Sequence, residues 1–156
     1  YYSLSADSIL SQLADKYTTY TSTGDIYALF IELSQQLLAK HAIATFIISN
    51  KWMRANYGQV LRKYIIENTN PVELIDFGQN LLFENAIVHT CIISLLKQKN
   101  QQALKGIRLP DNYFNNNNIH FNNFYEFRRQ MYLSADNWQN DCGYCGNMWW
   151  NSSHLG

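Results

Sequence analysis

The sequence has no net charge and no long hydrophobic run. Its 156 residues carry 12 Lys and Arg against 12 Asp and Glu, so overall charge does not indicate a polyanionic partner, although a local basic face stays open. The longest apolar runs fall far short of the roughly 18 residues that a membrane helix needs. The first residues, YYSLSADSIL, lack the charged and apolar regions of a signal peptide. We therefore expect a cytoplasmic protein without a membrane partner.

Cysteine is also scarce, with 3 residues. Cys91 lies in an apolar run and is expected to be a small buried side chain. Cys142 and Cys145 form one CGYC with the spacing of half a zinc site, and His154 could add a third ligand. Structural zinc usually takes four ligands, commonly from two such pairs, so an ordinary loop is favoured over a metal site or a redox pair. We predict no metal site, and the odd count argues against a disulfide-stapled secreted protein.

Complete catalytic motifs are missing as well. The sequence contains no GxSxG, no P-loop, no GxGxxG and no HExxH, and its 4 histidines are scattered. No catalytic residue is therefore predicted within this chain.

What is present is a chain long enough for one α/β domain with a real core. An amphipathic helix is predicted from Asp25, and the residues of its expected apolar side are Ile26, Leu29, Phe30, Leu33 and Leu37. The run IATFIIS at 43–49 predicts a strand covered on both faces, as in parallel sheets. A helix is predicted from Trp52, and it ends in ENTNP at 67–71 because proline disfavours helix in the preceding residue.

Two further strands are predicted at 72–78 and 88–99. About ten residues link them, which favours an antiparallel return because parallel strands need a crossover of a dozen or more residues. Beyond Lys99 the chain becomes rich in Asn and aromatic residues, and only short strands or a helix near 121–133 are indicated.

Polar and cationic groups follow the strand at 43–49 immediately, in the stretch SNKWMRANYG. In an open α/β sheet that edge is where ligands bind, so the stretch could border an active site, or it could be a plain strand-to-helix junction. Arg54 and Arg62 could position DNA phosphates while aromatic residues stack on bases. The aromatic residues of this stretch, however, share the apolar periodicity of Val60 and Leu61, which favours a core role for most of them.

The order of the segments resembles the catalytic region of adenine-specific DNA methyltransferases of restriction-modification systems, including type IIG enzymes and phage-defence methylases. The matching residues, found in order over about residues 15–99, are Asp25, Tyr27, Phe30 to Glu32, Phe46 to Lys51, Tyr57, Gly58, Leu61, Arg62, Ile75 to Gly78, Phe83, Ala86 and Thr90. A weaker similarity extends to YLSADNW at 132–138. One departure is His41-Ala42, where the family commonly turns with glycine.

The resemblance implies a partial class I (Rossmann-like) methyltransferase sheet with helices on both faces and an antiparallel last strand. It assigns residues 1–99 to the C-terminal half of the catalytic domain, and residues 100–156 to an extension toward a target-recognition region. Enzymes of this family bind S-adenosylmethionine through a Gly-rich loop and hold a flipped adenine with an Asn-Pro-Pro-Tyr motif. Neither element occurs in this sequence. We therefore expect a fragment that binds no cofactor alone and that lacks the N-terminal half of its domain.

Site expectations follow from the same resemblance. Asp25 and Tyr27 match positions near the cofactor and target-base pocket, and Asn50 and Lys51 are expected to line the cleft. With Arg54 and Arg62 they form the set of cleft-lining or DNA-binding residues, and double-stranded DNA is the partner of the parent protein. An exposed edge at the 43–49 strand is expected to permit self-association. The alternative function is a non-enzymatic nucleic-acid-binding or protein-interaction module.

Overall fold

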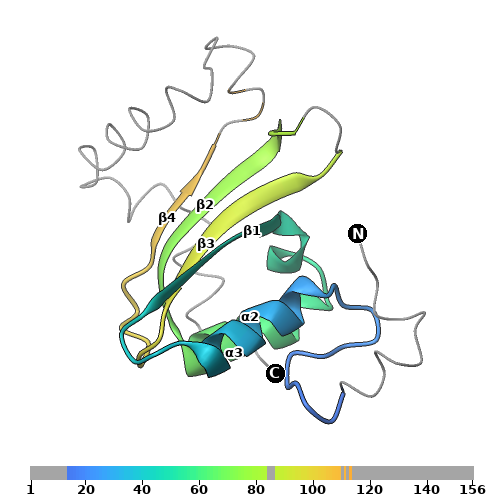
Figure 1. Ribbon diagram of the computed structural model, residues 1–156. Coiled ribbons are helices and arrows are strands. Elements are labelled where there is room, and N and C mark those ends of the chain that lie inside the picture. Colours follow the sequence, from blue (N-terminus) through green and yellow to red (C-terminus); the bar gives the residue numbers. More distant parts are fainter. Residues whose placement is uncertain (1–13, 84–86, 110, 112, 114–156) are drawn as a thin grey trace.

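The computed structural model describes residues 14–83, 87–109, 111 and 113 (Figure 1). The segment predicted near 121–133, and also Cys142, Cys145 and His154, lie outside these residues. The elements in chain order are α2 (Tyr27–Leu37), β1 (Ile43–Ser49), the short 3-10 helix η2 (Asn50–Met53), α3 (Gly58–Asn68), β2 (Asn70–Leu81), β3 (His89–Leu96) and β4 (Lys105–Arg108).

The strands form a sheet in the order β1-β3-β2-β4. β3 is antiparallel to both of its neighbours, pairing Ile43 with Leu96 on β1 and Ile75 with Ile92 on β2. β1 and β2 therefore run parallel to each other, and β4 adds a parallel strand beyond β2. The predicted antiparallel return is confirmed. The antiparallel strand β3 was predicted to be the last strand of the sheet. That prediction is wrong, because β4 lies beyond residue 99 and pairs with β2.

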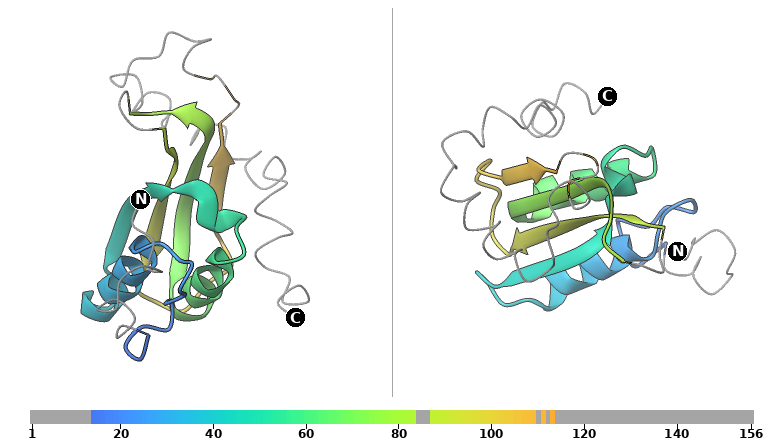
Figure 2. Two further views of the ribbon diagram at one scale, coloured as in Figure 1. Left: turned by 90° about the vertical axis from the view of Figure 1, so that its right-hand side faces the viewer. Right: turned by 90° about the horizontal axis from the view of Figure 1, so that it is seen from above.

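Both described helices pack on one face of the sheet. A single buried cluster contains Ile31 of α2, Trp52 of η2, Leu61 of α3 and Ile93 of β3. The opposite face carries a smaller cluster around Ile75, Phe77 and Leu109. The α/β class is thus confirmed, whereas the predicted helices on both faces are not found among the described residues (Figures 1 and 2).

Helix α2 buries part of the side that was predicted to face solvent. Glu32 and Gln35 are buried, while Phe30 is 52% and Leu37 is 76% exposed. Burial of Glu32 is possible because its carboxylate accepts hydrogen bonds from Thr18 and Thr19. On the predicted apolar side of α2, Leu29 is buried, whereas Phe30 and Leu37 lack cover within the described part of the chain.

Strand β1 is an edge of the described sheet and is open on one face. Ile43 and Ile47 are 56% and 52% exposed, whereas Phe46 and Ile48 pack against the core cluster. The boundaries predicted for this strand are confirmed. Its predicted burial on both faces is wrong, because one face of β1 is open in the described part of the chain. The turn before β1 places His41 at φ 65°, a left-handed conformation that glycine adopts more readily than other residues.

The predicted helix from Trp52 is divided in two. η2 ends at Met53, and α3 begins at Gly58, where a Cβ atom would lie 1.9 Å from the carbonyl oxygen of Trp52. Arg62 of α3 reaches back and donates to the carbonyl oxygens of Trp52 and Ala55. This close approach of the two backbones, which the apolar spacing does not reveal, turns α3 onto the sheet.

Candidate functional site

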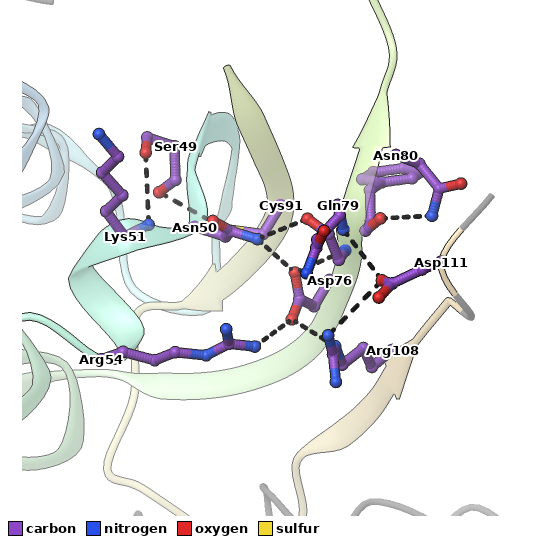
Figure 3. A network of polar contacts seen from close by, with 12 residues as sticks. Ser49, Asn50, Lys51, Arg54, Asp76, Gln79, Asn80, Cys91, Arg108 and Asp111 are labelled. Carbon is purple, nitrogen blue, oxygen red and sulfur yellow. Dashed lines mark hydrogen bonds and ion pairs between the residues drawn. The ribbon is translucent and has the colours of Figure 1, made fainter. Parts of the chain in front are cut away.

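Polar side chains gather at the edge of the sheet where β1, β2 and β4 end. Because these strands are parallel to one another, their carboxyl ends meet at one edge. Asn50 directly follows β1, Asp76 lies on β2, and Arg108 ends β4 (Figure 3). The structure thus brings together residues that are up to 58 positions apart in the sequence (108 − 50).

Asp76 is the centre of this group, and its side chain is only 10% exposed. Its Oδ1 accepts hydrogen bonds from Asn50 Nδ2 at 2.8 Å and from the Gly78 backbone N–H at 3.0 Å. Its Oδ2 lies 3.9 Å from Arg54 Nη2 and 3.6 Å from Arg108 Nε. One buried carboxylate therefore connects the ends of three elements.

Gly78 shapes the backbone beside this carboxylate. Its φ of 60° is left-handed, and a Cβ atom would lie 3.0 Å from the carbonyl oxygen of Leu109. Asp111 accepts a hydrogen bond from the Gln79 N–H at 3.3 Å and pairs with Arg108 at 3.7 Å. These contacts fix the segment after β4 against β2.

Sequence reasoning missed Asp76, Gly78 and Arg108 as site residues. Asp76 and Gly78 appeared only as part of the matching motif at 75–78. A carboxylate inside an apolar strand, followed two residues later by glycine, is the signal that could have identified them. No comparable pattern marks Arg108, because only the pairing of β4 with β2 brings it to the edge.

Asp25 and Tyr27 lie at the start of α2, near the same edge. Burial raises the pKa of the Asp25 carboxyl, and the positive charge of Lys51 acts on it in the opposite direction. The hydroxyl of Tyr27 lies 3.4 Å from that of Tyr57. Burial, and next the contact with Tyr57, raise the pKa of Tyr27. Burial thus dominates the surroundings of both groups, and their place in a cofactor cleft stays a prediction.

The cationic candidates occupy different surroundings. Arg54 has a half-exposed side chain beside Asp76, and Lys51 is exposed, with its backbone N–H donating to Ser49 Oγ at 3.3 Å. Arg62 instead lies within the η2–α3 junction, where burial lowers the pKa of its guanidinium. Asn50, Lys51 and Arg54 thus lie at the carboxyl edge, whereas the guanidinium of Arg62 faces backbone carbonyls.

The described residues contain no group of three or more His, Cys, Asp or Glu side chains placed to hold a metal ion. Nor does this part of the chain contain a helix that is long and apolar enough to cross a membrane.

Comparison with solved structures identifies the class of fold. The chain is similar to the crystal structure of a putative class I S-adenosylmethionine-dependent methyltransferase from Listeria monocytogenes, with a TM-score of 0.53 and 15% identity over 81% of this chain and 38% of the other. The fold is therefore that of part of a class I methyltransferase. The model of the Eco57I restriction-modification methylase family matches residues 2–83, and the chain belongs to that family.

Two curated relatives support this assignment. The type II restriction enzyme and methyltransferase RM.Eco57I of Escherichia coli is 34% identical over 83 residues, which cover 53% of this chain and 8% of the relative. The type II methyltransferase M.BstVI of Geobacillus stearothermophilus is 30% identical over 94 residues, covering 60% of this chain and 17% of the relative. The chain thus spans less than a fifth of the length of either relative.

Proposed function

We propose that this chain is the C-terminal half of the catalytic domain of an S-adenosylmethionine-dependent, adenine-specific DNA methyltransferase from a restriction-modification or phage-defence system. It acts in the cytoplasm on double-stranded DNA, and it does not methylate DNA alone. The single observation that carries the proposal is the carboxyl edge with Asn50, Asp76 and Arg54, in a chain that belongs to the Eco57I family. Ligands of open α/β sheets bind at such an edge.

We infer that the other half of the proposed catalytic domain lies beside β1. The chain passes from β1 through α3 to the parallel strand β2, and such crossovers are right-handed in nearly all proteins. α2 packs on the same face of the sheet as α3. If a parallel strand precedes α2, the same handedness puts that strand on the other side of β1 from β2, at the open edge.

Exposed apolar residues support this place for the missing half. Phe30 and Leu37 of α2, and Ile43 and Ile47 of β1, are each more than half exposed. A neighbouring strand and its helices would cover such side chains. Burial stabilises the folded protein by roughly 25 cal/mol for each Å² of apolar surface removed from water. In the isolated chain, a second copy could pair with the same edge.

The cofactor role of Asp25 and Tyr27 belongs to this proposal. Asp25 is 8% exposed and lies at the start of α2, where a carboxylate could accept from hydroxyl or amino groups of a bound nucleoside. The Gly-rich loop that would hold the rest of the cofactor is not in this sequence. Calorimetry of the isolated chain with S-adenosylmethionine should therefore detect no binding, and micromolar binding would contradict this division of the site.

The gene upstream of Tyr1 offers the most direct test. It should encode a Gly-rich loop followed by an Asn-Pro-Pro-aromatic motif, and absence of both would overturn the proposal. The longer protein, incubated with DNA and S-adenosylmethionine, should produce N6-methyladenine by mass spectrometry of the nucleosides. A methylated cytosine would contradict adenine specificity. Steeply salt-dependent DNA binding by the isolated chain, without any such upstream motifs, would favour the non-enzymatic alternative.

A further inference from the structure

The orientation of the Asn50 side chain follows from its two partners on β2. Its Nδ2 donates to Asp76 Oδ1 at 2.8 Å and to the carbonyl oxygen of Gly78 at 3.1 Å (Figure 3). Both partners are acceptors, so a flipped amide would place three oxygen atoms against one another. The amide nitrogen must therefore face β2, and the amide oxygen of Asn50 is turned away from it.

Asp76 is well suited to hold this orientation. The residue is 7% exposed, and its Oδ1 is also fixed by the Gly78 N–H at 3.0 Å. Its own carbonyl oxygen accepts from the Leu109 N–H at 2.8 Å, in the segment that follows β4. The carboxylate of Asp76 cannot turn without breaking its bonds to Asn50 and Gly78, so the direction of the Asn50 amide is set before any ligand binds.

Two guanidinium groups flank the same carboxylate. Arg54 and Arg108 approach Asp76 Oδ2 from opposite sides, and their side chains are 49% and 37% exposed. Their ion pairs are longer than a direct hydrogen bond, and each guanidinium has five N–H donors, so both can also bind solvent or a ligand. The outward-turned amide oxygen of Asn50 and the two cationic groups thus gather around one carboxylate, a combination that suits a nucleotide strand with its base amino groups and phosphates.

We propose that Asp76 is a positioning residue that presents the Asn50 amide oxygen to an amino group of a DNA base, while the two guanidinium groups at its other oxygen are placed for the backbone phosphates. Asp76 itself does not touch the DNA. The inference rests on the proposed function, and it adds Asp76 and Arg108 to the residues assigned to the DNA-facing edge.

The orientation of Asn50 can be tested in this chain without any methylation assay. NMR hydrogen exchange of the Asn50 side-chain amide should be at least about tenfold slower than that of Asn56, whose side chain is exposed. Asp76→Ala should bring the Asn50 rate to that of Asn56, whereas Asp111→Ala should leave it slow. Exchange of Asn50 at the Asn56 rate in the unchanged chain would overturn the inference.

The consequence for DNA is tested in the longer protein by steady-state kinetics. Asp76→Ala and Asn50→Ala should each raise KM for DNA about tenfold and change KM for S-adenosylmethionine less than about twofold. The double variant should show no further rise, because Asp76 acts through Asn50. Additive effects, or an equal rise in KM for the cofactor, would overturn the inference.

A conservative variant of Asp76 distinguishes the orientation of Asn50 from the effect of the negative charge on Asp76 and from a loss of folding. Asp76→Asn keeps an oxygen that can accept from Asn50 and Gly78, so KM for DNA should rise less than about threefold. A rise as large as that of Asp76→Ala would show that the charge on Oδ2 matters and not the orientation of Asn50. If the longer protein transfers no methyl group at all, the proposed function fails, while amide exchange still decides the orientation of Asn50.

Discussion

The carboxylate of Glu32 on α2 lies against the backbone of Thr19, with Oε2 accepting from both the N–H and the hydroxyl of Thr19 at 2.8 Å. Oε1 accepts from the N–H and the hydroxyl of Thr18 at 3.1 Å. Glu32 is 3% exposed. A charged residue thus joins the segment before α2 to the helix, on the side that the sequence pattern assigns to solvent.

The first prediction concerns this contact. Glu32→Ala should lower the free energy of unfolding by about 3 kcal/mol, because it leaves the buried N–H of Thr19 without its acceptor and also removes the bonds from Thr18. Denaturant unfolding followed by circular dichroism measures the change. Gln36→Ala on the exposed part of the same helix serves as the control and should change stability by less than about 0.5 kcal/mol. Equal effects of the two substitutions would contradict the role of Glu32.

Gly58 should not tolerate a side chain. A Cβ atom there would lie 1.9 Å from the Trp52 carbonyl oxygen, which belongs to the backbone and cannot rotate away. Gly58→Ala is therefore expected to cost about 3 kcal/mol of unfolding free energy, at the upper end of overpacking effects. Gln59→Ala, at the next and exposed position, is the matched control. Near-neutral behaviour of Gly58→Ala in thermal unfolding would show that η2 and α3 can move apart.

Arg62 should matter for stability more than for DNA. Arg62→Met keeps the aliphatic stem but removes the side-chain donor to the carbonyl oxygen of Trp52 and one of the two donors to that of Ala55, which should cost about 2 kcal/mol. Lys63→Met removes only a surface ion pair with Glu67 and should be nearly neutral. In the longer protein, kept well below its melting temperature, a large loss of DNA affinity from Arg62→Met would instead support direct DNA contact.

The thiol of Cys91 should make the chain sensitive to alkaline pH. Burial raises the pKa of Cys91 to about 12, above its ordinary value of 9.0. Above pH 9 the unfolded thiol ionises while the folded thiol keeps its proton, so the unfolded state binds fewer protons and stability falls as pH rises toward 12. Cys91→Ala should lose less stability between pH 8.5 and 10.5 than the unchanged chain. An identical alkaline decline in both proteins would contradict this assignment.

The open edge of β1 should promote association of the isolated chain. Ile47 is 52% exposed on this strand, and a lysine there should hinder edge pairing. We expect light scattering to detect dimers or larger species of the unchanged chain at high concentration, and to detect fewer of them for Ile47→Lys. Gln59→Lys, on α3, is the charge-matched control. If the unchanged chain stays monomeric at high concentration, the β1 edge does not mediate self-association.

Local pattern was sufficient for several elements. The apolar run at 43–49 and the strand β1 coincide, and the boundary before Pro71 agrees with the end of α3 at Asn68. The short connection correctly indicated the antiparallel pairing of β2 and β3. Such features depend on neighbours in the sequence, so periodicity and backbone sterics can determine them.

The candidate site was only partly predictable for the same reason. Asn50, Lys51 and Arg54 were expected at the edge because they follow a strand directly. Asp76 gains its role from Asn50 just after β1, from Arg54 after η2 and from Arg108 on β4, and no local pattern in the sequence indicates these partners. The burial of Glu32 likewise depends on Thr18 and Thr19, which lie outside α2.

The sequence by itself determined the class of fold, the elements of the α/β unit and the family to which they belong, because apolar spacing and ordered motifs are local properties of the chain. Tertiary structure alone decided that both described helices share one face, that α2 leaves Phe30 and Leu37 uncovered, and that Asp76 joins three elements. The physical reason is that burial, hydrogen bonding and charge pairing depend on which distant segments meet, and only the folded sheet brings those segments together.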